Sequence, residues 1–80
     1  MVILPAAYIL VSTEIGAENM VLEKISEIKG VLEAYILFGV YDIIIKIRSD
    51  SEEELKGNIM EEIRGTEGVS QTITLIMVDE

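Results

Sequence analysis

The sequence predicts a single α+β domain whose strands and helices follow the order β-α-β-β-α-β. Three features lead to this prediction. Four short runs are rich in β-branched residues, two segments carry apolar residues at helical spacing, and glycines follow both helical segments. The chain has 80 residues and a mass of 8.9 kDa, which suffices for one hydrophobic core and not for two.

The first strand and the first helix are separated by a glycine. Ala6–Thr13 is short, apolar and β-branched, and Gly16 follows it, so we expect a strand. Residues 17–28 predict an amphipathic helix, which Gly30 ends beside Lys29 at the negative end of the helix dipole. The apolar positions of this helix recur every three or four residues: Ala17, Met20, Val21, Ile25 and Ile28.

The middle of the chain predicts two strands joined by a tight turn. Residues 31–38 and Ile43–Arg48 are both apolar and β-branched. The segment between them, Gly39-Val40-Tyr41-Asp42, is long enough only for a hairpin. The two strands should therefore be antiparallel neighbours.

The second helix is predicted from its first turn. Ser51-Glu52-Glu53-Glu54 matches the capping box, in which the serine and the third glutamate satisfy each other's backbone amides. Gly57 lies inside this helix and costs about 1 kcal/mol relative to alanine. The helix has one apolar stripe, formed by Leu55, Ile59, Met60 and Ile63.

Residues 69–78 alternate polar and apolar and predict the last strand.

The two halves of the chain resemble each other at an offset of 38 residues, the spacing between Gly30 and Gly68. The same offset matches Ile25 with Ile63, as expected for two βαβ units. Such a pair is the ferredoxin-like arrangement, a four-stranded antiparallel sheet with both helices on one face. We predict this fold.

The uncovered face of that sheet is expected to be apolar. The third strand alternates Ile43, Ile45 and Ile47 with Ile44, so apolar groups stand on both sides. A patch of this kind on a small protein usually marks an interface, and packing two sheets together would bury it. We expect at least a homodimer, although an uncovered face that merely lowers solubility is the alternative. The candidate contacts are Tyr8, Leu10, Ile44, Ile36 or Tyr35, Ile76 and Val78.

Composition and charge exclude several functions. With 15 acidic and 6 basic residues, the net charge of −9 opposes direct binding to nucleic acid or to anionic membranes. Cysteine and histidine are absent and no glycine-rich phosphate loop occurs, so we expect no enzyme activity, no cofactor and no metal. No apolar run reaches the length of a membrane span, and no signal pattern precedes the first strand. We expect a cytoplasmic protein.

The hairpin is the candidate ligand site. Gly39, Tyr41 and Asp42 place open amides, a phenol and a carboxylate at one loop, although glycine and aspartate are also ordinary turn residues. Thr72 and Thr74 share one face of the last strand, where their hydroxyls can meet a ligand or simply suit a strand.

Five segments of the chain carry a further signal: AYILV at 7–11, Ile28-Lys29-Gly30-Val31, Gly39-Val40-Tyr41-Asp42-Ile43, Glu67-Gly68-Val69 and Thr72-Ile73-Thr74-Leu75. Together they resemble the RAM domain, the effector domain of the leucine-responsive regulatory protein/AsnC (Lrp/AsnC) family of transcription regulators. The resemblance covers about residues 6–78. It implies the βαββαβ fold, dimers formed through the sheets, further assembly into rings of the octamer or decamer type, and free amino acids bound between subunits.

The resemblance also suggests what each matching residue does. Gly39, Tyr41 and Asp42 match the family's ligand-contacting hairpin, and Thr72 and Thr74 match threonines that face the ligand. The family's helix-turn-helix domain has no counterpart in residues 1–80, so we expect a stand-alone effector domain that associates with full-length regulators. Three alternatives remain: a ligand-free assembly partner, a small dimeric enzyme such as a cofactor-free monooxygenase or isomerase, and an ACT domain. The G-x-Y-D hairpin and the T-x-T strand favour RAM over ACT.

Overall fold

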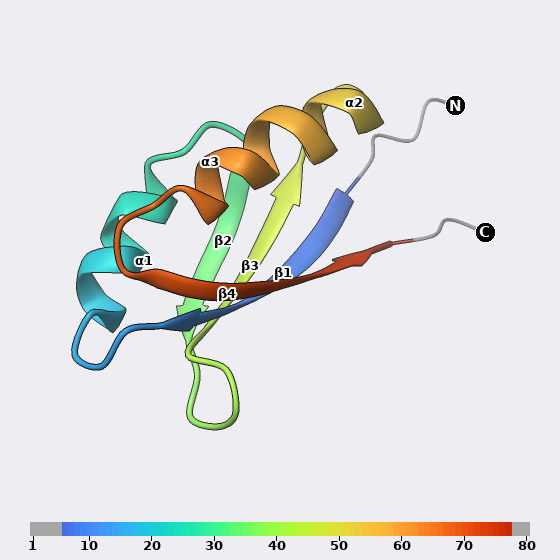
Figure 1. Cartoon of the computed structure of the whole chain (residues 1–80). Helices are drawn as coiled ribbons and strands as arrows, with labels where there is room; N and C mark the ends of the chain where they lie inside the picture. The colour runs from blue at the N-terminus through green and yellow to red at the C-terminus, as the bar shows by residue number, and fades with distance from the viewer. Residues whose placement is uncertain (1–5, 78–80) are drawn as a thin grey trace.

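The computed structural model describes residues 6–77 and has one sheet covered on one face by helices (Figure 1). The four strands lie in the order β2-β3-β1-β4, and every neighbouring pair is antiparallel. This arrangement confirms the ferredoxin-like fold. The elements are β1 (Ala6–Thr13), α1 (Glu18–Ser26), β2 (Val31–Ile36), β3 (Ile43–Arg48), α2 (Glu52–Glu54), the π-helical segment η1 (Leu55–Ile59), α3 (Met60–Arg64) and β4 (Val69–Ile76).

Helix α1 is shorter than the periodicity predicts. It ends at Ser26, because the next two amides bond three residues back and tighten the last turn. Glu27 N donates to Lys24 O at 3.3 Å, and Ile28 N donates to Ile25 O at 3.0 Å. Gly30 then turns the chain into β2 with a φ of +101°, a conformation that favours glycine.

The second helix begins as predicted but with half of the capping box. The Ser51 hydroxyl accepts a hydrogen bond from Glu54 N at 3.1 Å. The Ser51 backbone N–H donates to the Ser49 hydroxyl at 3.3 Å rather than to the Glu54 side chain. Segments α2, η1 and α3 then follow one another without a break, and the π-helical turn surrounds Gly57.

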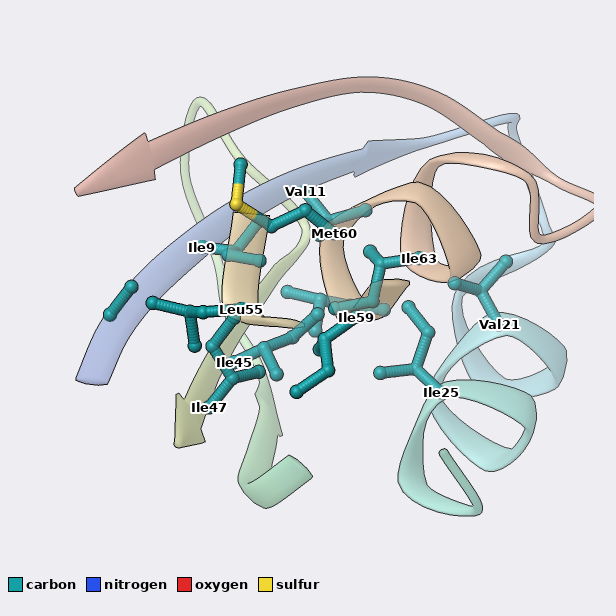
Figure 2. Close-up of a cluster of buried hydrophobic side chains, with 12 residues drawn as sticks. Ile9, Val11, Val21, Ile25, Ile45, Ile47, Leu55, Ile59, Met60 and Ile63 are labelled. Atoms are coloured by element: carbon teal, nitrogen blue, oxygen red, sulfur yellow. The ribbon is translucent and has the colours of Figure 1, made fainter. Parts of the chain in front are cut away.

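The hydrophobic core fills the space between the sheet and the helices (Figure 2). The predicted division of β3 is confirmed, since Ile43, Ile45 and Ile47 are fully buried while Ile44 points to the other face. The helices contribute their apolar stripes to the same cluster. The core residues are Ala7, Ile9, Val11, Val21, Ile25, Ile43, Ile45, Ile47, Leu55, Ile59, Met60 and Ile63.

A bulge in β2 changes which of its residues share a face. The pairing shifts between Val31 and Glu33, after which Ala34 and Ile36 lie on the helix side with the core isoleucines of β3. Tyr35 pairs with Ile44 and therefore lies on the open face. Of the two alternatives from the sequence, Tyr35 rather than Ile36 belongs to that face. Strict alternation along β2 would put Tyr35 on the same face as Val31. The bulge between Val31 and Glu33 makes that expectation wrong.

The register of β4 also corrects the sequence analysis. Ile76 pairs with Ala7, a core residue, so it lies on the helix side and not on the open face where we expected it. Leu75 and Ile73 take the open-face positions, opposite Tyr8 and Leu10. Val78 lies outside the described residues.

Within residues 6–77, no helix combines the length and the apolar character needed to cross a membrane.

Candidate functional site

The β2–β3 hairpin is closed and anchored by backbone hydrogen bonds. Leu37 N donates to Asp42 O at 2.8 Å, which closes the loop. Asp42 N donates to Val11 O at 2.9 Å and fixes the end of the loop against β1. The tip between these bonds carries Phe38 and Val40, whose side chains are almost fully exposed.

The side chain of Asp42 reinforces this anchor. Its Oδ2 accepts hydrogen bonds from Thr13 N at 2.8 Å and from the Thr13 hydroxyl at 3.4 Å. The carboxylate therefore accepts its hydrogen bonds from the last residue of β1 and not from a backbone amide of its own turn. Both bonds reach the same oxygen, so Asp42 holds the hairpin in place while its other oxygen has no bond to residues 6–77.

A groove of about 320 Å³ lies between the hairpin and the start of α1. Its volume is at the small end of the range for ligand pockets, about 300 to 1,000 Å³. The polar groups suit a small zwitterion, because carboxylates accept from an ammonium while amide N–H groups donate to a carboxylate. The lining residues are Glu18, Asn19, Ile36, Leu37, Phe38, Gly39 and Asp42.

The structure brings only some of the predicted ligand residues together. Gly39 and Asp42 line the groove, and Tyr41 lies half-buried in the same loop without lining it. Thr72 and Thr74 are on the far side of β1, where Thr72 pairs with Val11. Because β1 stands between β3 and β4, two strand spacings of about 5 Å each separate the backbone of Asp42 from that of Thr72.

The two threonines lie on the helix side of β4. They pair with Val11 and Ile9, two core residues, and are themselves half-buried. Thr72 lines a second groove of about 240 Å³, together with Arg64, Val69, Ser70 and Gln71. In a single copy of the chain, Thr72 and the hairpin residues Gly39 and Asp42 therefore line two different grooves.

Sequence reasoning missed Glu18 and Asn19, which it assigned only to a helix. The topology provides the signal that finds them. Strand β1 runs toward the end of the sheet at which β2 and β3 are joined, so the helix that follows β1 starts beside that hairpin (Figure 1). The first turn of α1 is therefore part of the groove wall.

The open face of the sheet is the other notable surface. Tyr8, Leu10 and Ile44 are half-buried there, and Tyr35 is 56% exposed. The Tyr35 hydroxyl donates to Glu33 Oε1 at 2.7 Å, and this bond, with the negative charge of Glu33, raises the pKa of Tyr35. The Nζ of Lys46 lies 5.8 Å from the centre of the Tyr8 ring. A shallow cleft of about 170 Å³ lies among these side chains.

No group of three or more acidic, histidine or cysteine residues within 6–77 is placed to hold a metal ion. The acidic groups of the hairpin groove therefore have no metal-binding arrangement around them.

Comparison with known proteins decides the family. The model of the Lrp/AsnC ligand binding domain matches residues 6–80. The chain belongs to this family. An HTH-type transcriptional regulator of Pyrococcus furiosus is 39% identical over 59 residues, a match that covers 74% of this chain and 39% of that regulator.

Solved structures agree with the Lrp/AsnC assignment. The crystal structure of FFRP-DM1 superposes with a TM-score of 0.87 at 36% identity and covers 92% of this chain and 99% of that one. A transcriptional regulator of Neisseria meningitidis, solved as an L-Met complex, shares the fold alone. Its TM-score is 0.79 at 15% identity, covering 95% of this chain and 51% of the regulator.

These matches confirm the resemblance found in the sequence and make the chain a ligand-binding domain of a transcription-regulator family. The chain spans about two-fifths of the length of the curated relatives it matches.

Proposed function

We propose that this Lrp/AsnC domain binds a free amino acid in the hairpin groove and regulates transcription without enzyme activity. The observation that carries the proposal is the composition of that groove. It combines Gly39 and Asp42, which the sequence resemblance assigns to the family's ligand hairpin, with Glu18, Asn19 and an apolar wall. The polar groups select an α-amino acid backbone, and the apolar wall contacts its side chain.

In this proposal the charges of the ligand are met separately. The ammonium lies between the carboxylates of Glu18 and Asp42, while the Asn19 side-chain amide and the Gly39 N–H donate to the ligand carboxylate. The bond from Thr13 N supports this role, because it holds Asp42 in one position before a ligand arrives. The L-Met complex of the Neisseria regulator makes amino acids the natural first class to test.

The remaining predicted ligand residues join through assembly. Since Thr72 and Thr74 lie across β1 from Asp42, we propose that the threonines of one copy approach the hairpin groove of another. Tyr41 borders the same junction. The ligand then lies between subunits and links binding to assembly.

We propose that the assembly starts from a homodimer formed through the open face and continues to a ring of the octamer or decamer type. The half-buried apolar residues Tyr8, Leu10 and Ile44 support the dimer, because a second sheet would remove them from water. Full-length Lrp/AsnC regulators are the proposed partners. The net charge of −9 favours contact with such proteins over direct contact with nucleic acid.

Isothermal calorimetry with each protein amino acid in turn tests the ligand. We expect saturable heat from one or a few, and a micromolar Kd would correspond to about −8 kcal/mol. Asp42→Asn removes the charge but keeps an oxygen that can accept from Thr13 N, so it should weaken binding about tenfold without unfolding the loop. Asp50→Asn, an exposed acid outside the groove, is the matched control.

Absence of heat across the panel, from a folded protein, would contradict the amino-acid site. The open face would then favour a second candidate, an assembly partner that joins related regulators without a ligand of its own.

A further inference from the structure

The open face carries far less acidic charge than the chain as a whole. The chain has 15 acidic residues, yet the described strands place only one of them, Glu33, on this face. Lys46 and Arg48 lie on the same face. Two copies of a chain with a net charge of −9 repel each other, so the face that joins them has to be an exception to that charge.

Glu33 and Lys46 are opposite each other but do not pair. They are direct cross-strand partners between β2 and β3, a position from which opposite charges usually interact. Within residues 6–77, the ion pairs closer than 4.0 Å join Lys24 to Glu67 and Arg64 to Glu61 only. Glu33 instead accepts from the Tyr35 hydroxyl, and Lys46 is drawn toward the Tyr8 ring.

We propose that Glu33 and Lys46 pair between subunits, so that each dimer carries two reciprocal ion pairs and the chain selects a second copy of itself. This inference rests on the dimer of the proposed function. In a two-fold interface a contact from residue A to residue B is repeated from B to A. When the two-fold axis passes between a positive and a negative group on one face, each of them meets its opposite on the partner.

The dimensions are suitable for this pairing. Facing sheets pack about 10 Å apart, a gap that a lysine and a glutamate span from opposite sides. The neighbours of the pair reinforce it, because the Tyr35 hydroxyl already orients the Glu33 carboxylate and Tyr8 holds the Lys46 ammonium within the apolar surround. Complementary charges of this kind contribute mainly to the choice of partner and to register.

Charge reversal tests the proposal by sedimentation of the full chain, with circular dichroism to confirm folding. Glu33→Lys alone and Lys46→Glu alone each place like charges across the interface, and each should weaken self-association at least about tenfold. An equimolar mixture of the two variants should recover a mixed dimer of near wild-type affinity, because every pair across its interface is again opposite. The double variant should recover as well.

Three results would overturn the proposal. If the double variant recovers while the mixture does not, the pair forms within one chain. If the single variants dimerise like the wild type, the charges do not contribute to self-association. If the wild type is monomeric, the proposed interface does not form. Amino-acid titration of the wild type is read separately, so an intact dimer that binds no amino acid would contradict the ligand site and leave this inference standing.

Discussion

The two faces of the sheet carry similar apolar residues but bury them to different extents. Along β3, Ile43 and Ile45 are fully buried beneath the helices, while Ile44 between them is only partly covered on the open face. On β2, Tyr35 of the open face is 56% exposed. Hydropathy does not distinguish the three positions of β3, since all of them are isoleucine. The covered face stabilises the single chain, and the open face is the surface that we propose a second chain covers.

The largest expected effect comes from the covered face. Ile45→Ala should lower the free energy of unfolding by about 3 kcal/mol, because it leaves a cavity among fully buried side chains. Ile44→Ala removes the same atoms from the open face and should cost the single chain less than about 1 kcal/mol. Chemical denaturation at several protein concentrations separates unfolding from dissociation. Equal losses for the two variants would show that the faces are not distinct.

A charge on the open face should act on assembly. Ile44→Asp is expected to raise the dimer Kd at least about tenfold, because the carboxylate would have to lose its water in the interface. Ile44→Val keeps the site apolar and is the control. Sedimentation equilibrium gives the mass, and circular dichroism gives the fold. An Ile44→Asp protein that keeps the wild-type mass would refute packing through this face.

Strengthening the helical cover should leave the open face untouched. An alanine Cβ at Gly57 meets no atom within 4 Å, so Gly57→Ala should stabilise the chain by about 0.5 to 1 kcal/mol. Gly30→Ala is the contrasting variant, because Gly30 has a φ of +101° and its Cβ would collide with Ile59. It should destabilise the chain. Thermal unfolding measures both, and a change in the dimer Kd with Gly57→Ala would contradict the separation of the faces.

The smallest effect concerns the titration of the open face. The hydrogen bond to Glu33 and its negative charge raise the pKa of Tyr35 above the ordinary 10.0. Because the pKa of Tyr35 is higher in the folded state than in the unfolded state, the hydrogen bond contributes fully to folding stability below pH 10. That contribution is lost as the pH rises through the folded-state pKa. Ultraviolet titration should show one late tyrosine that Glu33→Gln returns toward its ordinary value. No change in that variant would mean that the hydrogen bond is absent in solution.

The fold was predictable because its signals are local. The β-branched runs, the serine cap at Ser51 and the glycine at Gly30 act within a few residues of where they lie, and β1 and β3 have the bounds that the sequence predicts. Strand β2 ends at Ile36, two residues early, because the chain already leaves the sheet to form the hairpin that Leu37 and Asp42 close.

The faces of the edge strands were harder to predict. Alternation assumes an unbroken pleat, and the bulge between Val31 and Glu33 breaks it. In β4 both faces mix apolar and polar groups and both are partly exposed, so the pattern does not say whether Thr74 or Leu75 faces the helices. Only the register against Tyr8 and Ile9 decides, and register depends on residues far away in the sequence.

The candidate site was predictable in part for the same reason. Gly39 and Asp42 were found through a motif within one loop, whereas Glu18 joins them only through the packing of α1 beside the hairpin. The bond from Thr13 N to Asp42 likewise links two segments that no local pattern connects. That Gly39, Asp42 and the other predicted ligand residues, Tyr41, Thr72 and Thr74, contact a ligand stays a prediction.

The position of β1 between β3 and β4 has a consequence for how the protein folds. Ala7 pairs with Ile76, so the first strand is completed by the last one. Until β4 joins the sheet, the other side of β1 presents unpaired backbone groups. Contacts so distant in sequence slow folding and prolong exposure of that edge. A partly folded chain in which β4 is still unpaired therefore exposes the sheet edge that is open to aggregation.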